Sequence, residues 1–143
     1  MPETTGIVLF AHGSRDALWR APIEAVAARV RTLAPSARVC CAYLEHTAPD
    51  LPAAVQALLA EGARAVTVWP MFLGAGRHAR EDLPRLVQEL RQRHPGLLIT
   101  LQPPIAEHPA VLDAMARTAL TRTQTDVDVN ANVGWVERQR NPS

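Results

Sequence analysis

Lysine is absent from this chain of 143 residues, in which all 15 basic side chains are arginines. This absence excludes a lysine Schiff base and the lysine of a phosphate-binding P-loop. Cysteine is also scarce, and Cys40 and Cys41 are adjacent within an apolar run. Their spacing predicts neither a disulfide framework nor a metal site, so we expect small core residues in a reducing compartment.

The sequence also has no strong excess of either charge and no long apolar run. Its 15 basic and 14 acidic residues give a net charge of +1, which argues against a general nucleic-acid binder. The N-terminus does not have the pattern of a secretory signal, and the charge-free stretch 65–76 is too short to span a bilayer. We therefore expect a cytoplasmic protein with no nucleic-acid and no membrane partner.

Short β-like runs alternate with longer helical patterns along the chain. We predict strands at 7–11, 38–44, 65–69 and 97–101, and helices at 16–33, 50–60, 79–93 and 109–120. The strands are continuous apolar runs rather than alternating ones, which is typical of burial on both faces. The sequence therefore predicts an α/β fold: a doubly wound, four-stranded parallel sheet with helices on both faces.

The chain divides into a predicted α/β domain, residues 1–122, and a polar C-terminal extension, residues 123–143. Within the domain, Asp50 is expected to cap the N-terminus of the second helix, and Gly62 to follow its C-terminus. Strict alternation of apolar residues in the extension leaves two possibilities open. We expect a loosely attached tail rather than an added edge strand.

Reactive side chains follow three of the predicted strands. His12 comes after the first strand, Glu45 and His46 after the second, and His78 after the third. Because the carboxyl ends of parallel strands meet at one edge of a sheet, these loops are expected to open onto that edge. Each residue alone has an ordinary structural explanation, but imidazoles together with a carboxylate suit cobalt, nickel, iron or zinc ions.

Two other chemistries are suggested by local motifs and do not hold. The glycine pattern at 74–79 resembles a dinucleotide fingerprint, but four residues separate it from the strand, and no acidic residue follows the next strand. A phosphohistidine nucleophile at His12 is disfavoured because Ala11 stands where such enzymes place an arginine. Gly74 and Gly76 are instead expected to let the backbone approach a large flat ligand and to place His78.

Three segments of the chain resemble a known family. They are IVLFAHGSRDALWRAPIEAVAARV, CAYLEHTAPDLPAAVQALLAEGARAVTVWPMFLGAGRHAREDLP and LRQRHPG…LQPPIAEHPAVLDAMA, covering residues 6 to about 120. They are similar to the short CbiX/SirB-type sirohydrochlorin chelatases. These class II chelatases insert a divalent metal into a tetrapyrrole without ATP. The HGSR and P-x-F-L-x-x-G-x-H-x-x-x-D signatures, in this order, make the resemblance specific.

The resemblance implies a single chelatase lobe with defined site residues. His12 and His78 match the family's metal-binding and catalytic histidines, and Glu45 matches an acidic residue at the second strand end. Short forms are expected to build their cleft by homodimerisation. The resemblance implies no permanently bound cofactor: the metal is a substrate, with cobalt preferred over iron or nickel, in cobalamin or sirohaem biosynthesis.

Beyond the family motif, we infer how the substrate is held. Ser14 and three arginines, Arg15, Arg77 and Arg80, are expected to bind the carboxylates of the macrocycle. A freed imidazole or Glu45 is expected to accept the pyrrole protons, while residues 71–73 either floor the tetrapyrrole cavity or pack in the core. A non-catalytic metal carrier or tetrapyrrole-binding module is the alternative function.

Overall fold

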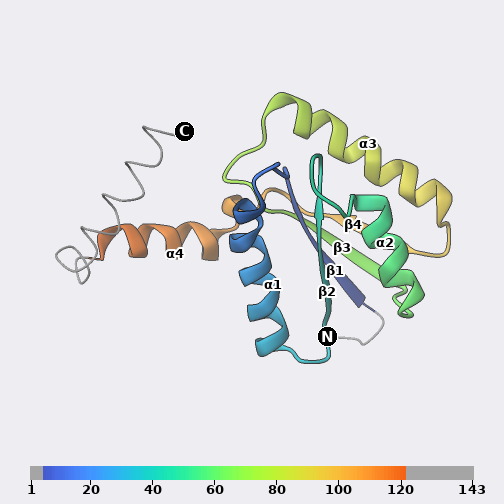
Figure 1. Cartoon of the computed structure of the whole chain (residues 1–143), viewed down its shortest axis with the longest axis horizontal. Helices are drawn as coiled ribbons and strands as arrows, with labels where there is room; N and C mark the ends of the chain where they lie inside the picture. The colour runs from blue at the N-terminus through green and yellow to red at the C-terminus, as the bar shows by residue number, and fades with distance from the viewer. Residues whose placement is uncertain (1–4, 122–143) are drawn as a thin grey trace. The chain divides into compact units, whose positions relative to one another are not determined.

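A four-stranded parallel sheet forms the centre of the computed structural model, which describes residues 5–121 (Figure 1). The strands are β1 (Thr5–Ala11), β2 (Arg38–Tyr43), β3 (Ala65–Pro70) and β4 (Leu98–Leu101), in the order β2-β1-β3-β4. The α-helices are α1 (Ala21–Leu33), α2 (Leu51–Ala60), α3 (Arg77–Arg93) and α4 (Pro109–Leu120). The 3-10 turns η1 (Ala17–Arg20) and η2 (Ile105–Glu107) precede α1 and α4. The predicted α/β class and parallel sheet are confirmed.

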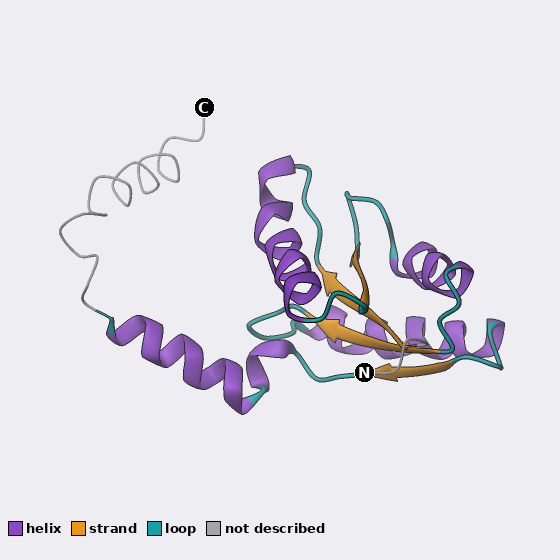
Figure 2. Ribbon diagram, turned by 90° about the horizontal axis from the view of Figure 1, so that it is seen from below, coloured by secondary structure: helices purple, strands orange, loops and turns teal. Residues whose placement is uncertain are grey.

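Helices lie on both faces of the sheet, as Figures 1 and 2 show. Side chains of a strand alternate between the two faces, so Val8 and Phe10 of β1 pack with α2 and α3. Leu9 points to the other face, where it packs with Ala27 of α1. Because β1 is central and buried on both sides, its run of apolar residues is continuous.

The helix predicted at 16–33 is divided into two parts. Asp16 accepts a hydrogen bond from the backbone N–H of Leu18 and caps η1, whereas α1 begins only at Ala21. Pro22 lies in the first turn of α1. Proline is disfavoured inside a helix and favoured in its first turn, and this agrees with the start of α1 at Ala21.

The second helix has the predicted ends. The Asp50 carboxylate accepts a hydrogen bond from the Ala53 N–H at 2.9 Å, which satisfies one free donor of the first turn of α2. Gly62 follows the helix with a φ of 98°, the left-handed conformation that favours glycine.

The third helix begins two residues earlier than predicted, at Arg77. His78 is therefore part of the first turn of α3 rather than of the loop before it. Pro84 lies inside α3, which continues to Arg93 as predicted.

The chain divides into two compact units, one containing the sheet and extending to His108, the other containing α4. The α4 helix has the predicted bounds and carries an ion pair between Asp113 and Arg117 at 2.7 Å. In the described range 5–121, no helix is long and apolar enough to span a membrane. The extension predicted at 123–143 lies outside the described residues.

An arginine from the preceding helix binds the backbone of each edge strand. Arg31 of α1 donates to the Val39 carbonyl at 3.1 Å, and Arg91 of α3 donates through Nε and Nη2 to the Ile99 carbonyl. These bonds occupy acceptors that would otherwise be open to another strand. They disfavour association of two chains through the sheet edges.

Candidate functional site

Three loops meet at the carboxyl edge of the sheet. They follow β1, β2 and β3, and because β1 pairs with both β2 and β3, the loops begin side by side. The backbone pairing continues past the strands, since Leu44 donates to the Ala11 carbonyl and Met71 donates to the Phe10 carbonyl. The predicted meeting of these loops at one edge is confirmed.

Gly13 allows the first loop to pack directly on the second. It has a φ of 91°, and a Cβ at this position would overlap the backbone oxygen of Glu45. The Glu45 N–H donates to the His12 carbonyl at 3.0 Å, so the two chains are held together at this point. Both the backbone conformation and the close approach require glycine.

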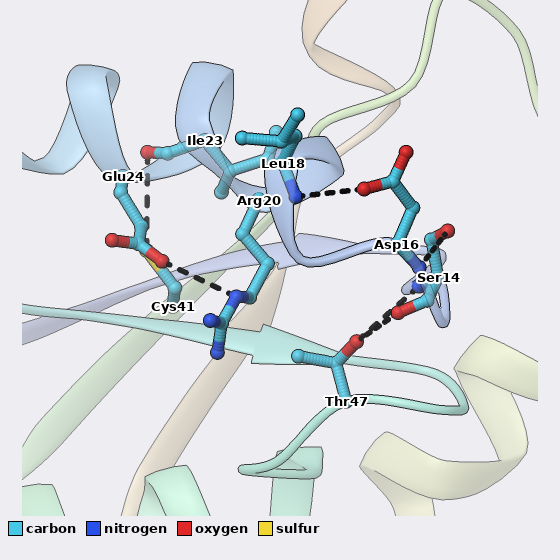
Figure 3. Close-up of polar contacts among 8 residues, drawn as sticks. All are labelled: Ser14, Asp16, Leu18, Arg20, Ile23, Glu24, Cys41 and Thr47. Atoms are coloured by element: carbon cyan, nitrogen blue, oxygen red, sulfur yellow. Dashed lines mark hydrogen bonds and ion pairs between the residues drawn. The ribbon is translucent and has the colours of Figure 1, made fainter.

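A side-chain clamp joins the same two loops one residue further on. The Ser14 N–H donates to Thr47 Oγ1 at 3.3 Å, and the Thr47 hydroxyl donates to the Ser14 carbonyl at 2.8 Å (Figure 3). Thr47 was not identified from the sequence. Its role depends on a contact across 33 positions, and no local pattern indicates such a contact.

The charged groups of these loops form a short chain at the surface. Arg15 Nε donates to His46 Nδ1 at 3.4 Å, and His46 Nε2 lies 3.7 Å from the Glu45 carboxylate. His46 has a φ of 64°, which is uncommon for a residue with a side chain. The predicted substrate contact Arg15 is therefore adjacent to the predicted proton acceptor Glu45.

His12 lies against the aromatic ring of Phe72 from the third loop. The two ring centroids are 4.3 Å apart with an interplanar angle of 22°, which is a stacked arrangement. Phe72 is 5% exposed, whereas His12 is exposed at the rim. The ring of Phe72 thus belongs to the core and also contacts His12, whereas the floor of a tetrapyrrole cavity stays a prediction.

An apolar hollow of about 460 Å³ begins at His12. Its lining includes Leu18, Trp19, Met71, Leu73 and Gly74. Leu18 and Leu73 are 80% and 81% exposed, so apolar side chains stand uncovered beside the imidazole. This surface suits the flat face of a large, partly apolar ligand.

The remaining predicted residues lie on the first turn of α3. Arg77 and Arg80 are exposed, and Arg77 pairs with Glu81 at 3.3 Å. His78 is exposed as well. In the described part of the chain, no hydrogen bond or ion pair joins this turn to the loops of His12 and Glu45, and no group of three potential metal ligands converges.

A second hollow, of about 540 Å³, lies beside α1 and the edge strand β2 and contains no histidine. Cys40, Cys41 and Tyr43 are among its lining residues, and the Cys41 thiol donates to the Ile23 carbonyl (Figure 3). Burial raises the pKa of Cys40 to about 11 and that of Tyr43 to about 12, and it also raises the pKa of Cys41. These groups are protonated near neutral pH, so they do not supply a thiolate ligand or nucleophile.

Comparison with known sequences identifies relatives of one kind. The CbiX family model matches residues 6–121. A sirohydrochlorin cobaltochelatase of Methanocaldococcus jannaschii is 32% identical over 90 residues, which cover 62% of each chain. Another, of Methanococcoides burtonii, is 23% identical over 84% of this chain and 98% of its own. A chloroplastic sirohydrochlorin ferrochelatase of Arabidopsis thaliana is 26% identical over 88% of this chain but only 57% of its own. The matched region thus spans less than two thirds of the M. jannaschii and A. thaliana relatives.

Solved structures show the same fold. A putative cobalamin biosynthesis CbiX protein from Marinobacter aquaeolei superposes with a TM-score of 0.70 and 35% identity, covering 80% of this chain and 93% of the other. The sirohydrochlorin chelatase SirB from Bacillus subtilis, in complex with cobalt, gives a TM-score of 0.68 at 23% identity and is matched over 49% of its length. The family match runs through the whole sheet and all three loops of the site, and on this basis the chain belongs to the CbiX family.

Proposed function

We propose that this protein inserts a divalent metal into sirohydrochlorin without ATP, with cobalt as the preferred ion and iron or nickel as alternatives. The observation that carries the proposal is the position of His12, an exposed imidazole at the sheet edge beside an apolar hollow of about 460 Å³. Membership of the CbiX family supports it, since relatives of this chain include sirohydrochlorin cobaltochelatases and a ferrochelatase.

The proposed chemistry requires a ligand that binds the metal and then releases it. His12 and His78 are the proposed ligands, because neutral imidazole binds cobalt, iron and nickel. Among the described residues no group of three potential metal ligands converges, so the proposed ligands would leave coordination positions open. An open shell suits an ion that is substrate rather than structural cofactor.

Insertion also releases two protons from the pyrrole N–H groups. Glu45 is the proposed acceptor, because its carboxylate is 60% exposed at the rim and one backbone hydrogen bond from His12. An imidazole freed by metal transfer is the second acceptor.

The macrocycle is proposed to lie on the apolar surface beside His12 with its carboxylates directed to the rim. Arg15, Arg77 and Arg80 are exposed and are the proposed partners of these carboxylates, since guanidinium groups bind carboxylates in a bidentate manner. Ser14 is proposed to contact the substrate with its hydroxyl. A Cβ on Gly74 or Gly76 would meet no protein atom within 4 Å, so nothing in the described chain occupies the space above this turn.

A second copy of the chain is proposed to close the cleft. The side chains of Leu18 and Leu73 are exposed, and an arginine binds one backbone carbonyl of each edge strand, which favours association through the rim over the sheet edges. Light scattering at the assay concentration tests this part of the proposal. We expect a dimer, and an active monomer would overturn the shared cleft.

An anaerobic absorbance time course tests the function. The purified protein is mixed with sirohydrochlorin and cobalt(II), iron(II) or nickel(II), beside a control without protein. We expect formation of the metallated spectrum well above the control, and its loss in His12→Ala and His78→Ala. His94→Ala, at the C-terminus of α3, is the matched control and is expected to keep full activity.

The same experiment separates catalysis from transport. A non-catalytic carrier or tetrapyrrole-binding module would bind the pigment or the ion and leave the insertion rate at that of the control. That result would contradict the proposed chelatase function and support a carrier or binding module instead.

A further inference from the structure

A histidine that binds a metal usually has its ring fixed by a hydrogen bond at the other nitrogen. A carboxylate, a backbone carbonyl or a water normally accepts that bond. Among residues 5–121, neither nitrogen of the His12 imidazole has a hydrogen-bond partner. The ring must therefore be oriented by something else if it is to present a lone pair in a fixed direction.

The only ring packed flat against His12 in the described chain is that of Phe72. Its centroid lies 4.3 Å away with an interplanar angle of 22°. Stacking uses the face of the imidazole, whereas both nitrogen lone pairs lie in the plane of the ring. The contact therefore restricts the orientation of the imidazole and leaves both nitrogens open.

Phe72 is itself held in place by the core. It is 5% exposed, and the ring of Phe10 meets it edge-on at 6.4 Å. Its carbonyl accepts a hydrogen bond from the Ala106 N–H at 3.4 Å, which ties the third loop to η2. A ring fixed in this way is a rigid surface for its neighbour.

The backbone of His12 is fixed independently of Phe72. The Glu45 N–H donates to the His12 carbonyl, and Gly13 packs on the Glu45 backbone. The remaining freedom of His12 is rotation of its side chain. Phe72 is the residue that restricts this rotation.

We propose that Phe72 is a positioning residue, which orients the His12 imidazole for metal transfer by stacking against its face. This inference rests on the proposed function, because it gives a role to the orientation of a metal ligand. Orientation by stacking, in place of a hydrogen bond to one nitrogen, leaves the ligand free to bind and release an ion without breaking a second polar contact. It suits a histidine that hands its metal to a substrate.

The test compares three variants of the full chain. Phe72→Leu removes the aromatic ring but keeps an apolar side chain, whereas Phe72→Tyr keeps an aromatic ring at this position. Leu90→Val is the matched control, since Leu90 is 2% exposed in the same core cluster and lies near the C-terminus of α3. Thermal unfolding of all variants verifies that they are folded.

Two measurements do not need insertion activity. The first is the proton NMR spectrum of the His12 ring, assigned with His12→Ala, in which the current of a stacked phenyl ring shifts the signals upfield. We expect Phe72→Leu to lose this shift, and we expect Phe72→Tyr and Leu90→Val to keep it. The second is titration with cobalt(II) alone, where we expect about tenfold weaker binding for Phe72→Leu only, as for loss of other orienting contacts.

The insertion rate then links the stack to the reaction. We expect kcat to fall in Phe72→Leu with little change in KM for sirohydrochlorin, and to recover in Phe72→Tyr. Equal NMR shifts and equal cobalt affinities in Phe72→Leu and Leu90→Val would overturn the positioning role. An inactive wild-type chain that keeps the NMR difference would contradict the proposed function and leave the orientation of His12 by Phe72 intact.

Discussion

Replacement of Gly13 by alanine tests how the first two loops of the site are held together. The φ of 91° at this position costs a residue with a Cβ about 1–3 kcal/mol. The new methyl group would also overlap the Glu45 carbonyl oxygen, so the two loops must separate. This separation would lengthen or break the hydrogen bond from the Glu45 N–H to the His12 carbonyl. It would also affect the two hydrogen bonds between Ser14 and Thr47.

The expected loss of stability in Gly13→Ala has two parts, the strain of the backbone and the loss of hydrogen bonds between the loops. Loss of two of those hydrogen bonds adds about 1–3 kcal/mol to the backbone cost. We therefore expect Gly13→Ala to lower the free energy of unfolding by about 4 kcal/mol in total, measured by urea denaturation followed by circular dichroism.

Two matched glycines supply the controls. Gly62 has a similar φ of 98° but open space at its Cβ position, so Gly62→Ala carries the same backbone cost alone, about 1–3 kcal/mol. Gly74 has neither a positive φ nor a neighbour within 4 Å, and Gly74→Ala is expected to stay within about 0.5 kcal/mol of the wild type. If Gly13→Ala is no more destabilising than Gly62→Ala, the close packing of the two loops is refuted.

Other features of the structure lead to further expected outcomes. Thr47→Val keeps the shape of the side chain but removes both bonds to the Ser14 backbone, so we expect a loss of about 2 kcal/mol in urea denaturation, whereas Thr47→Ser stays near the wild type. The raised pKa of Cys40, about 11 against an ordinary value of 9.0, predicts slow alkylation by iodoacetamide at neutral pH, and rapid alkylation of the folded chain would contradict it. The folded state holds this proton to higher pH than the unfolded chain does, so its contribution to stability is complete below pH 9.0 and is lost as the pH rises toward 11. Melting temperatures across this range are expected to fall, and to fall less in Cys40→Ala.

The sequence carries most of the information about the fold because the patterns involved are local. Apolar runs and the Asp50 cap are read within a few residues, and they correctly predict the strands and the start of α2. The order of the strands is not a local property and was not predicted. The predicted start of the first helix at residue 16 is wrong, since residues 17–20 form a separate 3-10 turn and α1 begins at Ala21 with Pro22 in its first turn.

The site was predicted less completely than the fold. Topology alone brings the loop of His12 next to that of Glu45, and the backbone bond between them agrees with this prediction. The Thr47 clamp and the stack of His12 on Phe72 depend on loop conformations and side-chain angles, which neighbouring residues in the sequence do not encode. The roles assigned to the site residues stay predictions until variants are measured.

The central claim is that this chain catalyses metal insertion through His12. The most direct test is the amount of cobalt-sirohydrochlorin formed per chain when both substrates are in large excess over the protein. We predict many equivalents of product from the wild type, at a rate well above the reaction without protein, and a rate near that background from His12→Ala. Product limited to one equivalent per chain, or an unchanged rate in His12→Ala, would contradict this account.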